Sequence, residues 1–162
     1  MIKCAPQFIK GNMMSWHPHA TVAVIVEKDG KFLLVEEHSS GQIVLNQPAG
    51  HIEDNESFIT AAIRETLEET AWHVKPEFLV GLYVHRSSNN NVTYHRTCYY
   101  AKALGFDADR KLDDGIIRAI WLSRDEIAAN LPKLRSPMVL KCIDDYLAGN
   151  RYPLEFIHEQ FD

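Results

Sequence analysis

The stretch from Asn46 to Trp72, NQPAGHIEDNESFITAAIRETLEETAW, limits the possible folds more than any other part of this 162-residue chain. A Pro-Ala-Gly turn is followed by a run that reads as a helix over Ser57–Thr70, with Asp54 or Asn55 as a plausible N-cap. A strand that stops at a stiff turn and passes into one helix is typical of layered α/β folds.

The expected helix ends with a cluster of acidic residues, Glu65, Glu68 and Glu69. At 100° per residue the three side chains share an arc of about 100°, and like charges one turn apart repel each other. Only Arg64 can pair forward along the helix, with Glu68. The simplest interpretation is a solvated acidic face.

The other positions of this helix favour a different interpretation. Ile59, Ile63 and Leu67 share a separate face, which we expect to pack on the core. Towards the N-terminus, the glutamate face continues into Ala61 and Ala62, where a solvated face would more often carry Lys, Gln or Ser. Small residues there indicate a partly covered groove.

A divalent cation would remove the repulsion among the glutamates. Oxygen-only ligands suit Mg²⁺, Mn²⁺ or Ca²⁺, and Mg²⁺ commonly bridges one or two carboxylates to substrate phosphates. Gly50 permits backbone conformations that other residues avoid, so its carbonyl could face the metal. The sequence therefore predicts a metal site for a phosphorylated substrate, formed by Gly50, Glu65, Glu68 and Glu69.

Strand patterns surround the helix on both sides. We expect strands over His19–Val26, Phe32–Glu36, Gln42–Gln47, Phe78–His85, Thr93–Leu104 and Ile116–Leu122. Ser123 and Glu126 form a capping box at the start of a short helix, and Ser136-Pro137 opens a last helix that ends near Leu147, before Gly149. This irregular alternation predicts a mixed-sheet α/β or α+β sandwich rather than a doubly wound parallel fold.

Composition excludes several classes of function. The net charge of −5 argues against nonspecific nucleic-acid binding, so we expect no DNA partner. No apolar run approaches the roughly 20 residues of a membrane span, and the N-terminus has no signal-peptide pattern. Cys4, Cys98 and Cys142 lie far apart without a CxxC pair, which predicts reduced, mostly buried thiols and a cytoplasmic protein.

The spacing of the charged residues resembles the box shared by the Nudix hydrolases. That box reads Gly, five residues, Glu, seven residues, Arg-Glu, an aliphatic, any residue, Glu-Glu, any residue, Gly and an aliphatic. The matching positions are Gly50, Glu56, Arg64, Glu65, Glu68 and Glu69. Two positions depart: Thr66 replaces the aliphatic residue, and Ala71 replaces the second glycine.

The resemblance reaches beyond the box. NQPAGH ahead of it, and LRSP and RYPLE near the C-terminus, look like one bacterial subgroup. Its members are phosphatases on nucleoside di- and triphosphates and on thiamin or hydroxymethylpyrimidine diphosphates. The likeness covers roughly His17–Ile157 and implies a Nudix α/β/α sandwich with a mixed β-sheet over residues 17–162. Residues 1–16 are expected to be an N-terminal extension.

The resemblance also implies roles for residues of the box. Glu65, Glu68 and Glu69 would bind Mg²⁺, or Mn²⁺ as a substitute, with help from the Gly50 carbonyl. Arg64 would orient a glutamate through a salt bridge. Metal ions neutralise phosphoryl oxygens and lower the pKa of bound water, which is the chemistry that a phosphohydrolase needs.

The general base is a box glutamate or an acid on a later loop, for which Asp114 and its neighbour Asp113 are the candidates. Family members often carry that acid six residues before the tryptophan equivalent to Trp121, and Gly115 occupies that position here. Asp-Asp-Gly could also be a plain turn.

Three further residues are candidates for substrate binding. Arg96 lies in an expected strand and could bind a phosphate bidentately, although it could equally be a surface strand residue. Arg135 and Ser136 precede a helix N-terminus, which favours anions, but they could also be a plain N-cap with a charge beside it.

We therefore expect a Mg²⁺-dependent hydrolase for a small phosphorylated metabolite or nucleotide, and a monomer. One alternative is a Nudix pyrophosphatase for another diphosphate, such as a dinucleotide polyphosphate or a nucleotide sugar. Another is a Nudix domain that binds a ligand without catalysis, whose box would be degraded.

Overall fold

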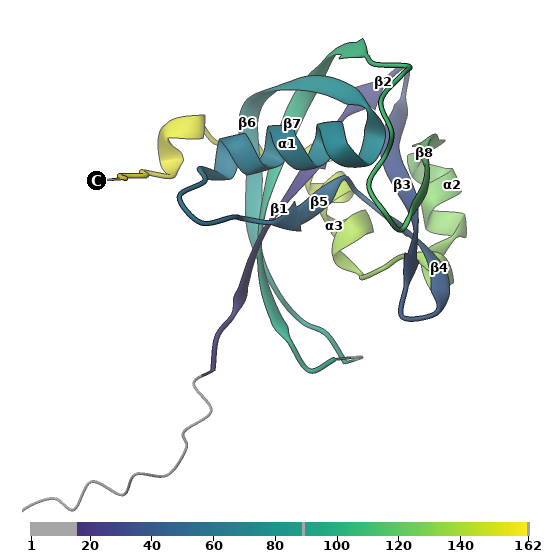
Figure 1. Cartoon of the computed structure of the whole chain (residues 1–162), viewed down its shortest axis with the longest axis horizontal. Coiled ribbons are helices and arrows are strands. Elements are labelled where there is room, and N and C mark those ends of the chain that lie inside the picture. Colours follow the sequence, from purple (N-terminus) through teal and green to yellow (C-terminus); the bar gives the residue numbers. More distant parts are fainter. Residues whose placement is uncertain (1–15, 89, 162) are drawn as a thin grey trace, which may run out of the picture.

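The computed structural model of the chain describes residues 16–88 and 90–161. Figure 1 shows its elements in order. They are β1 (His19–Ile25), β2 (Glu27–Lys28), β3 (Lys31–Ser39), β4 (Gln42–Asn46), β5 (Ala49–His51), α1 (Phe58–Thr70), β6 (Trp72–Arg86), β7 (Thr93–Phe106), β8 (Ile116–Ser123), α2 (Arg124–Ala129), η1 (Leu131–Lys133), α3 (Met138–Leu147) and η2 (Leu154–Phe156).

The strands form two sheets. In the first, the order is β5-β1-β7-β6, with β1 parallel to β7 and the other pairs antiparallel. In the second, β3 pairs antiparallel with β2, β4 and β8. The expected mixed sheet is therefore confirmed, and the doubly wound parallel alternative does not apply.

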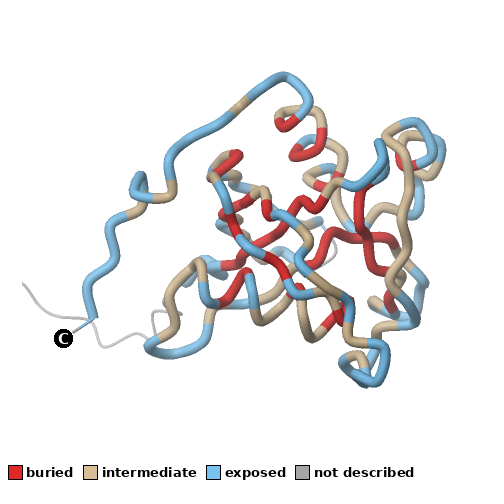
Figure 2. Tube along the Cα trace, turned by 90° about the horizontal axis from the view of Figure 1, so that it is seen from above, coloured by how far each residue is buried: buried red, intermediate tan, exposed pale blue. Residues whose placement is uncertain are grey.

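The first sheet lies between helices, because residues of β1 alternate between two hydrophobic clusters. Val22 and Val24 pack in the cluster that contains Ala61 and Ala62 of α1. Ala23 and Ile25 pack in the cluster that contains residues of α2 and α3. Figure 1 shows α1 and α3 on opposite sides of this sheet, and in Figure 2 the buried segments gather in the interior of the molecule.

The first residue of α1 differs from the expectation. The N-cap is Ser57, whose side chain accepts a hydrogen bond from the Thr60 N–H, rather than Asp54 or Asn55. Asn55 instead has a positive φ of 58° in the preceding turn. The capping box of Ser123 and Glu126 at α2 is confirmed, and α3 begins at Met138, one residue later than expected.

The buried face of α1 also differs from the expected stripe. Ile63 is 36% exposed, whereas Ala61, Ala62, Thr66 and Glu69 are buried. The predicted stripe is confirmed for Ile59, which packs against the core cluster that contains Ala61 and Ala62, and is wrong for Ile63. Here α1 turns its small residues and one glutamate inwards, so the interpretation of a solvated acidic face does not hold for Glu69.

Several strands are longer than predicted, and β3 runs over Lys31–Ser39 rather than Phe32–Glu36. β6 begins at Trp72 rather than Phe78, because the β-bulges between His73 and Val74 and between Pro76 and Phe78 let the chain pass Pro76 without ending the pairing. β7 continues to Phe106.

Within the described residues, Cys98 and Cys142 are buried and free, as expected. Cys4 and nearly all of the expected N-terminal extension fall outside the described residues. None of the helices that the structure describes is long and apolar enough to cross a membrane.

Candidate functional site: an arginine-centred glutamate cluster beside a pocket

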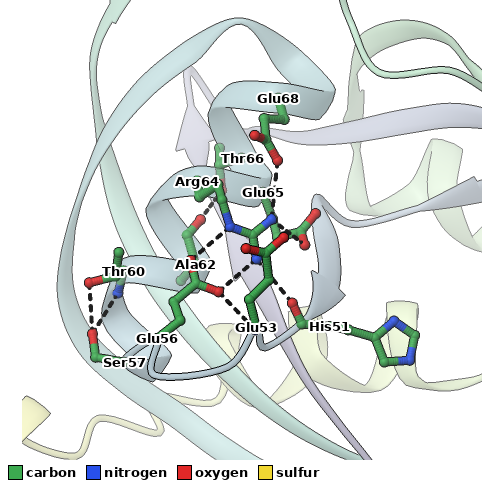
Figure 3. Close-up of polar contacts among 10 residues, drawn as sticks. All are labelled: His51, Glu53, Glu56, Ser57, Thr60, Ala62, Arg64, Glu65, Thr66 and Glu68. Carbon is green, nitrogen blue, oxygen red and sulfur yellow. Dashed lines mark hydrogen bonds and ion pairs between the residues drawn. The ribbon is translucent and has the colours of Figure 1, made fainter. Parts of the chain in front are cut away.

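Arg64 is the centre of the acidic cluster (Figure 3). Its Nε and Nη2 donate to the two carboxylate oxygens of Glu56, each at 2.7 Å. Nη1 donates to Glu65 at 2.8 Å and to Glu68 at 3.1 Å, and Nη2 also donates to the His51 carbonyl at 3.0 Å. One guanidinium therefore ties the strand β5, the loop before α1 and the helix together.

The pKa values of Glu56 and Glu65, both paired with Arg64, shift in opposite directions. The hydrogen bonds from Arg64 hold the pKa of Glu56 below its ordinary value. Burial raises the pKa of Glu65, although Arg64 opposes that shift and Glu68 adds to it. Glu56 is thus a fixed anion that holds Arg64, whereas Glu65 is a carboxylate in a poorly solvated site.

Gly50 lies directly against Glu65. A Cβ at position 50 would lie 2.1 Å from the Glu65 carboxyl carbon and 2.1 Å from its Oε1. Gly50 belongs to β5 and is not among the described glycines with a positive φ. The glycine is needed for space, not for a special backbone conformation, which corrects the reason expected from the sequence.

Glu69 is the most buried of the three acidic candidates, at 8% exposure. Its Oε2 accepts a hydrogen bond of 2.9 Å from the Ala49 N–H. Burial raises the pKa of Glu69 to about 8, against the Ala49 hydrogen bond and with further contributions from Glu37 and Glu65. Burial disfavours the ionised form of the Glu69 carboxylate. A cation bound in place of the proton would offset this cost.

Across the described residues, no three His, Cys, Asp or Glu side chains are already gathered around one point as metal ligands. In their place, Arg64 binds Glu65 and Glu68, and the Ala49 N–H binds Glu69. The donor set is nevertheless chemically suited to Mg²⁺, because it consists of carboxylates crowded against a glycine backbone.

The loop before β8 places its two acids differently. The Asp113 N–H donates to the Glu68 carbonyl at 3.1 Å, and the Asp113 charge contributes to raising the pKa of Glu65. The Asp114 side chain is 97% exposed and pairs with Lys111 at 3.4 Å. The structure therefore brings Asp113 to the cluster and leaves Asp114 in solvent.

A pocket lies on the other side of the β5 backbone. Its lining combines residues of β1, of the end of β3, of β5, of the β6–β7 hairpin and of the start of α3 with the two residues Arg135 and Ser136 before it: Thr21, Ser39, Ser40, Ala49, Gly50, His51, His85, Ser87, Asn90, Tyr94, Arg96, Arg135, Ser136 and Met138. All three candidate substrate-binding residues are in this set, and Gly50 belongs to both the pocket and the glutamate cluster.

Both arginines of the pocket are held by buried polar residues that the sequence analysis did not single out. Arg135 donates to Glu37 at 2.6 Å, and Arg96 donates to Gln47 at 3.2 Å. Glu37 and Arg135 are 98 residues apart, so spacing in the sequence carries no signal of their pairing. The one available signal was a glutamate at the end of a strand whose other residues are largely apolar.

Comparison with known proteins places this site in a wider group. The family described as "NUDIX domain" matches residues 16–142. The chain is 36% identical over 140 residues to "Phosphatase NudJ" of Escherichia coli (strain K12), which covers 86% of this chain and 90% of that protein.

Solved structures give the same result for the fold. A NUDIX hydrolase from Nitrosomonas europaea superposes with a TM-score of 0.87 at 49% identity, covering 89% of this chain and 98% of that one. A UDP-X diphosphatase superposes with a TM-score of 0.68 at 20% identity, covering 89% and 70%, and supports the fold alone. The residues 16–142 that match the family include β5, α1 and the residues that line the pocket.

Proposed function

Because the chain belongs to the Nudix family and is a Nudix phosphohydrolase, we propose that it releases phosphate from nucleoside di- or triphosphates, or from related organic diphosphates such as thiamin or hydroxymethylpyrimidine diphosphate, in a Mg²⁺-dependent reaction. The observation that carries this proposal is the shared position of Gly50, which touches Glu65 on one side and lines the arginine-bearing pocket on the other. A phosphate bound in the pocket would therefore lie beside the carboxylates.

The residues around Gly50 fit a Mg²⁺ ion. Glu65, Glu68 and Glu69, with the Gly50 carbonyl, would hold it, and the space that a Cβ would fill at Gly50 leaves room for this crowding. Oxygen-only donors also accept Mn²⁺. When bound, such a metal neutralises phosphoryl oxygens and lowers the pKa of water.

The residues of the chain have separate tasks in the proposed reaction. Arg64 keeps Glu65 and Glu68 aligned, and Glu56 holds Arg64 in place through two hydrogen bonds. Glu65 or Glu68 is the proposed proton acceptor for the attacking water. Asp113 replaces Asp114 as the loop acid in this proposal, because Asp114 extends into solvent.

Arg96, Arg135 and Ser136 are the proposed contacts for the phosphate groups. All three line the pocket, where an arginine can bind two phosphate oxygens at once. The positive charge of the two arginines would complement the negative charge of the phosphates. Gly50 lies between the pocket and the glutamate cluster.

The similarity to a phosphatase at 36% identity favours this substrate class over the pyrophosphatase alternative. The likeness to the UDP-X diphosphatase is one of fold, so it does not favour nucleotide sugars. A binding module without catalysis is disfavoured because every charged residue of the box is present and Arg64 connects three of its glutamates.

The test is a substrate panel with Mg²⁺, measuring release of phosphate and of pyrophosphate. The panel contains nucleoside di- and triphosphates, thiamin diphosphate, ADP-ribose and a dinucleotide polyphosphate. Turnover of the first two groups with phosphate as the product is expected. Preferred turnover of ADP-ribose or the dinucleotide polyphosphate would favour the pyrophosphatase, and a ligand that raises the Tm without turnover would indicate a binding module.

A further inference from the structure

Two buried polar side chains, Glu37 on β3 and Gln47 after β4, lie behind the pocket and have no part in the function proposed above. Glu37 is 7% exposed and Gln47 is 1% exposed. Neither lines the pocket, yet each holds an arginine that does.

The Glu37 pair is the stronger of the two. The Glu37 Oε2 accepts a hydrogen bond of 2.6 Å from Arg135 Nη1, and the Arg135 side chain is 44% exposed. A guanidinium carries five N–H donors, and Arg135 uses Nη1 for Glu37 while its side chain also lines the pocket. One end of the guanidinium is therefore anchored, and the rest is available to a ligand.

The Gln47 pair repeats the arrangement without a charge. Gln47 Oε1 accepts from Arg96 Nη1 at 3.2 Å, and the Asn46 Oδ1 accepts from Arg96 Nη2 at 3.4 Å. The two arginines therefore reach the pocket from β7 and from the segment before α3. Each is held by a residue outside the pocket lining, Arg135 by Glu37 on β3 and Arg96 by Gln47 after β4.

Glu37 and Gln47 each carry a buried polar atom that would ordinarily have a hydrogen-bond partner. Among the described residues, Glu37 Oε1 and Gln47 Nε2 are buried without a hydrogen-bond partner. Buried polar atoms are nearly always paired, and exceptions recur where function requires them.

From this geometry we propose that Glu37 is a positioning residue for substrate phosphates. It holds Arg135 in a preset orientation at the pocket, as Gln47 holds Arg96, so that the two arginines form one phosphate-binding pair. The inference depends on the proposed function, since it assigns the pocket to phosphate groups. Preset donors lower the ordering cost of binding, so the effect should appear in KM.

The test compares Glu37→Gln, Arg135→Ala and the double variant with the wild type, on the nucleotide with the best turnover. Glu37→Gln should raise KM by at least about tenfold while kcat stays within about threefold. In the Arg135→Ala background, Glu37→Gln should have no further effect on KM, because both changes remove the same contact. Glu37→Asp, which keeps the charge, should recover part of the loss.

Glu36→Gln is the matched control. It makes the same substitution one residue away and breaks the Glu36–Arg118 pair of 2.7 Å, whose partner is exposed on β8 rather than in the pocket. It should leave KM unchanged. Circular dichroism and the Tm of each variant exclude misfolding as the cause.

Three outcomes would overturn the inference: additive effects of Glu37→Gln and Arg135→Ala, a lower Tm with an unchanged KM, or a lower KM, which would mean that Glu37 competes with the substrate. If the wild type hydrolyses no nucleotide, the proposed function fails on its own. In that case, binding of inorganic pyrophosphate with Mg²⁺ is measured by calorimetry. Weaker binding to Glu37→Gln but not to Glu36→Gln supports the inference. Equal binding to all proteins, or binding to none of them, refutes it.

Discussion

Gly50 and Glu65 occupy the same small space: a Cβ on residue 50 would lie 2.1 Å from the Glu65 carboxyl carbon. The contact joins β5 to α1 and sets how closely the backbone approaches the carboxylate. The side chain of Glu65 is long and could swing away, but it would then lose its 2.8 Å hydrogen bond from Arg64.

Gly50→Ala should therefore reduce both the activity and the stability of the protein. We expect kcat/KM to fall by at least about tenfold, with an overpacking cost of about 1–3 kcal/mol. The control is Gly105→Ala, because a Cβ there would meet nothing within 4 Å and Gly105 has no positive φ. Equal effects of the two substitutions on kcat/KM would contradict the account.

Arg64→Lys should destabilise the protein. A lysine has one charged nitrogen and cannot reproduce the five hydrogen bonds that Arg64 makes to Glu56, Glu65, Glu68 and the His51 carbonyl. Urea unfolding should show a loss of about 1–3 kcal/mol. Arg118→Lys, at a side chain that is 59% exposed, should change the unfolding free energy by less than about 0.5 kcal/mol.

The stability of the metal-free protein should depend on Glu69 between about pH 4.5 and pH 8. The pKa of Glu69 is raised from 4.5 to about 8 in the folded state, so in this range the folded state binds a proton that the unfolded state has released. Stability from this group is therefore full below the lower value and is lost as the pH rises, by at most about 1.4 kcal/mol per pH unit.

Glu69→Gln removes this proton linkage. With EDTA present, the Tm of the variant should fall less than that of the wild type between about pH 5.5 and pH 8. Stabilisation of the wild type by Mg²⁺ should grow over the same range, since the metal displaces the proton. Parallel Tm curves for the two proteins would show that Glu69 is not the titrating group.

Ala71→Gly should stabilise the protein by about 0.5–1 kcal/mol. Ala71 closes α1 in the left-handed region at φ 60°, where its N–H donates to the Leu67 carbonyl and a Cβ is unfavourable. Relief of this strain should exceed the loss of a buried methyl group. Ala148→Gly, at the end of α3 where φ is −69°, should have the opposite sign, and thermal unfolding of both variants measures it.

The sequence predicted the features that depend on residues close together in the chain. The i,i+4 spacing correctly indicated that Arg64 pairs with Glu68, and the helix pattern correctly placed the last helical residue at Thr70. The irregular alternation of strands and helices correctly predicted the mixed sheet. The β-bulge at Pro76 is a local adjustment of pairing that periodicity does not record.

The remaining features depend on contacts between distant segments. The buried face of α1 was predicted only in part, because Ile63 is 36% exposed while Glu69 packs inwards and accepts a hydrogen bond from the Ala49 N–H. Asp113 and Asp114 are adjacent acids in one turn, and the fold separates them: the Asp113 N–H donates to the Glu68 carbonyl, whereas Asp114 pairs with Lys111 in solvent. The Arg135–Glu37 pair requires the fold to bring together residues 98 positions apart.

The most direct measurement of the central claim is phosphate release by the wild type, Glu68→Gln and Glu69→Gln, with Mg²⁺ and with EDTA, and with exposed Glu155→Gln as the control. The account predicts that EDTA stops the wild type, that each site variant loses at least about 10² in rate while staying folded, and that Glu155→Gln keeps full activity. A wild-type rate unaffected by EDTA, or full activity in both site variants, would contradict the assignment of the glutamate cluster as the metal-dependent active site.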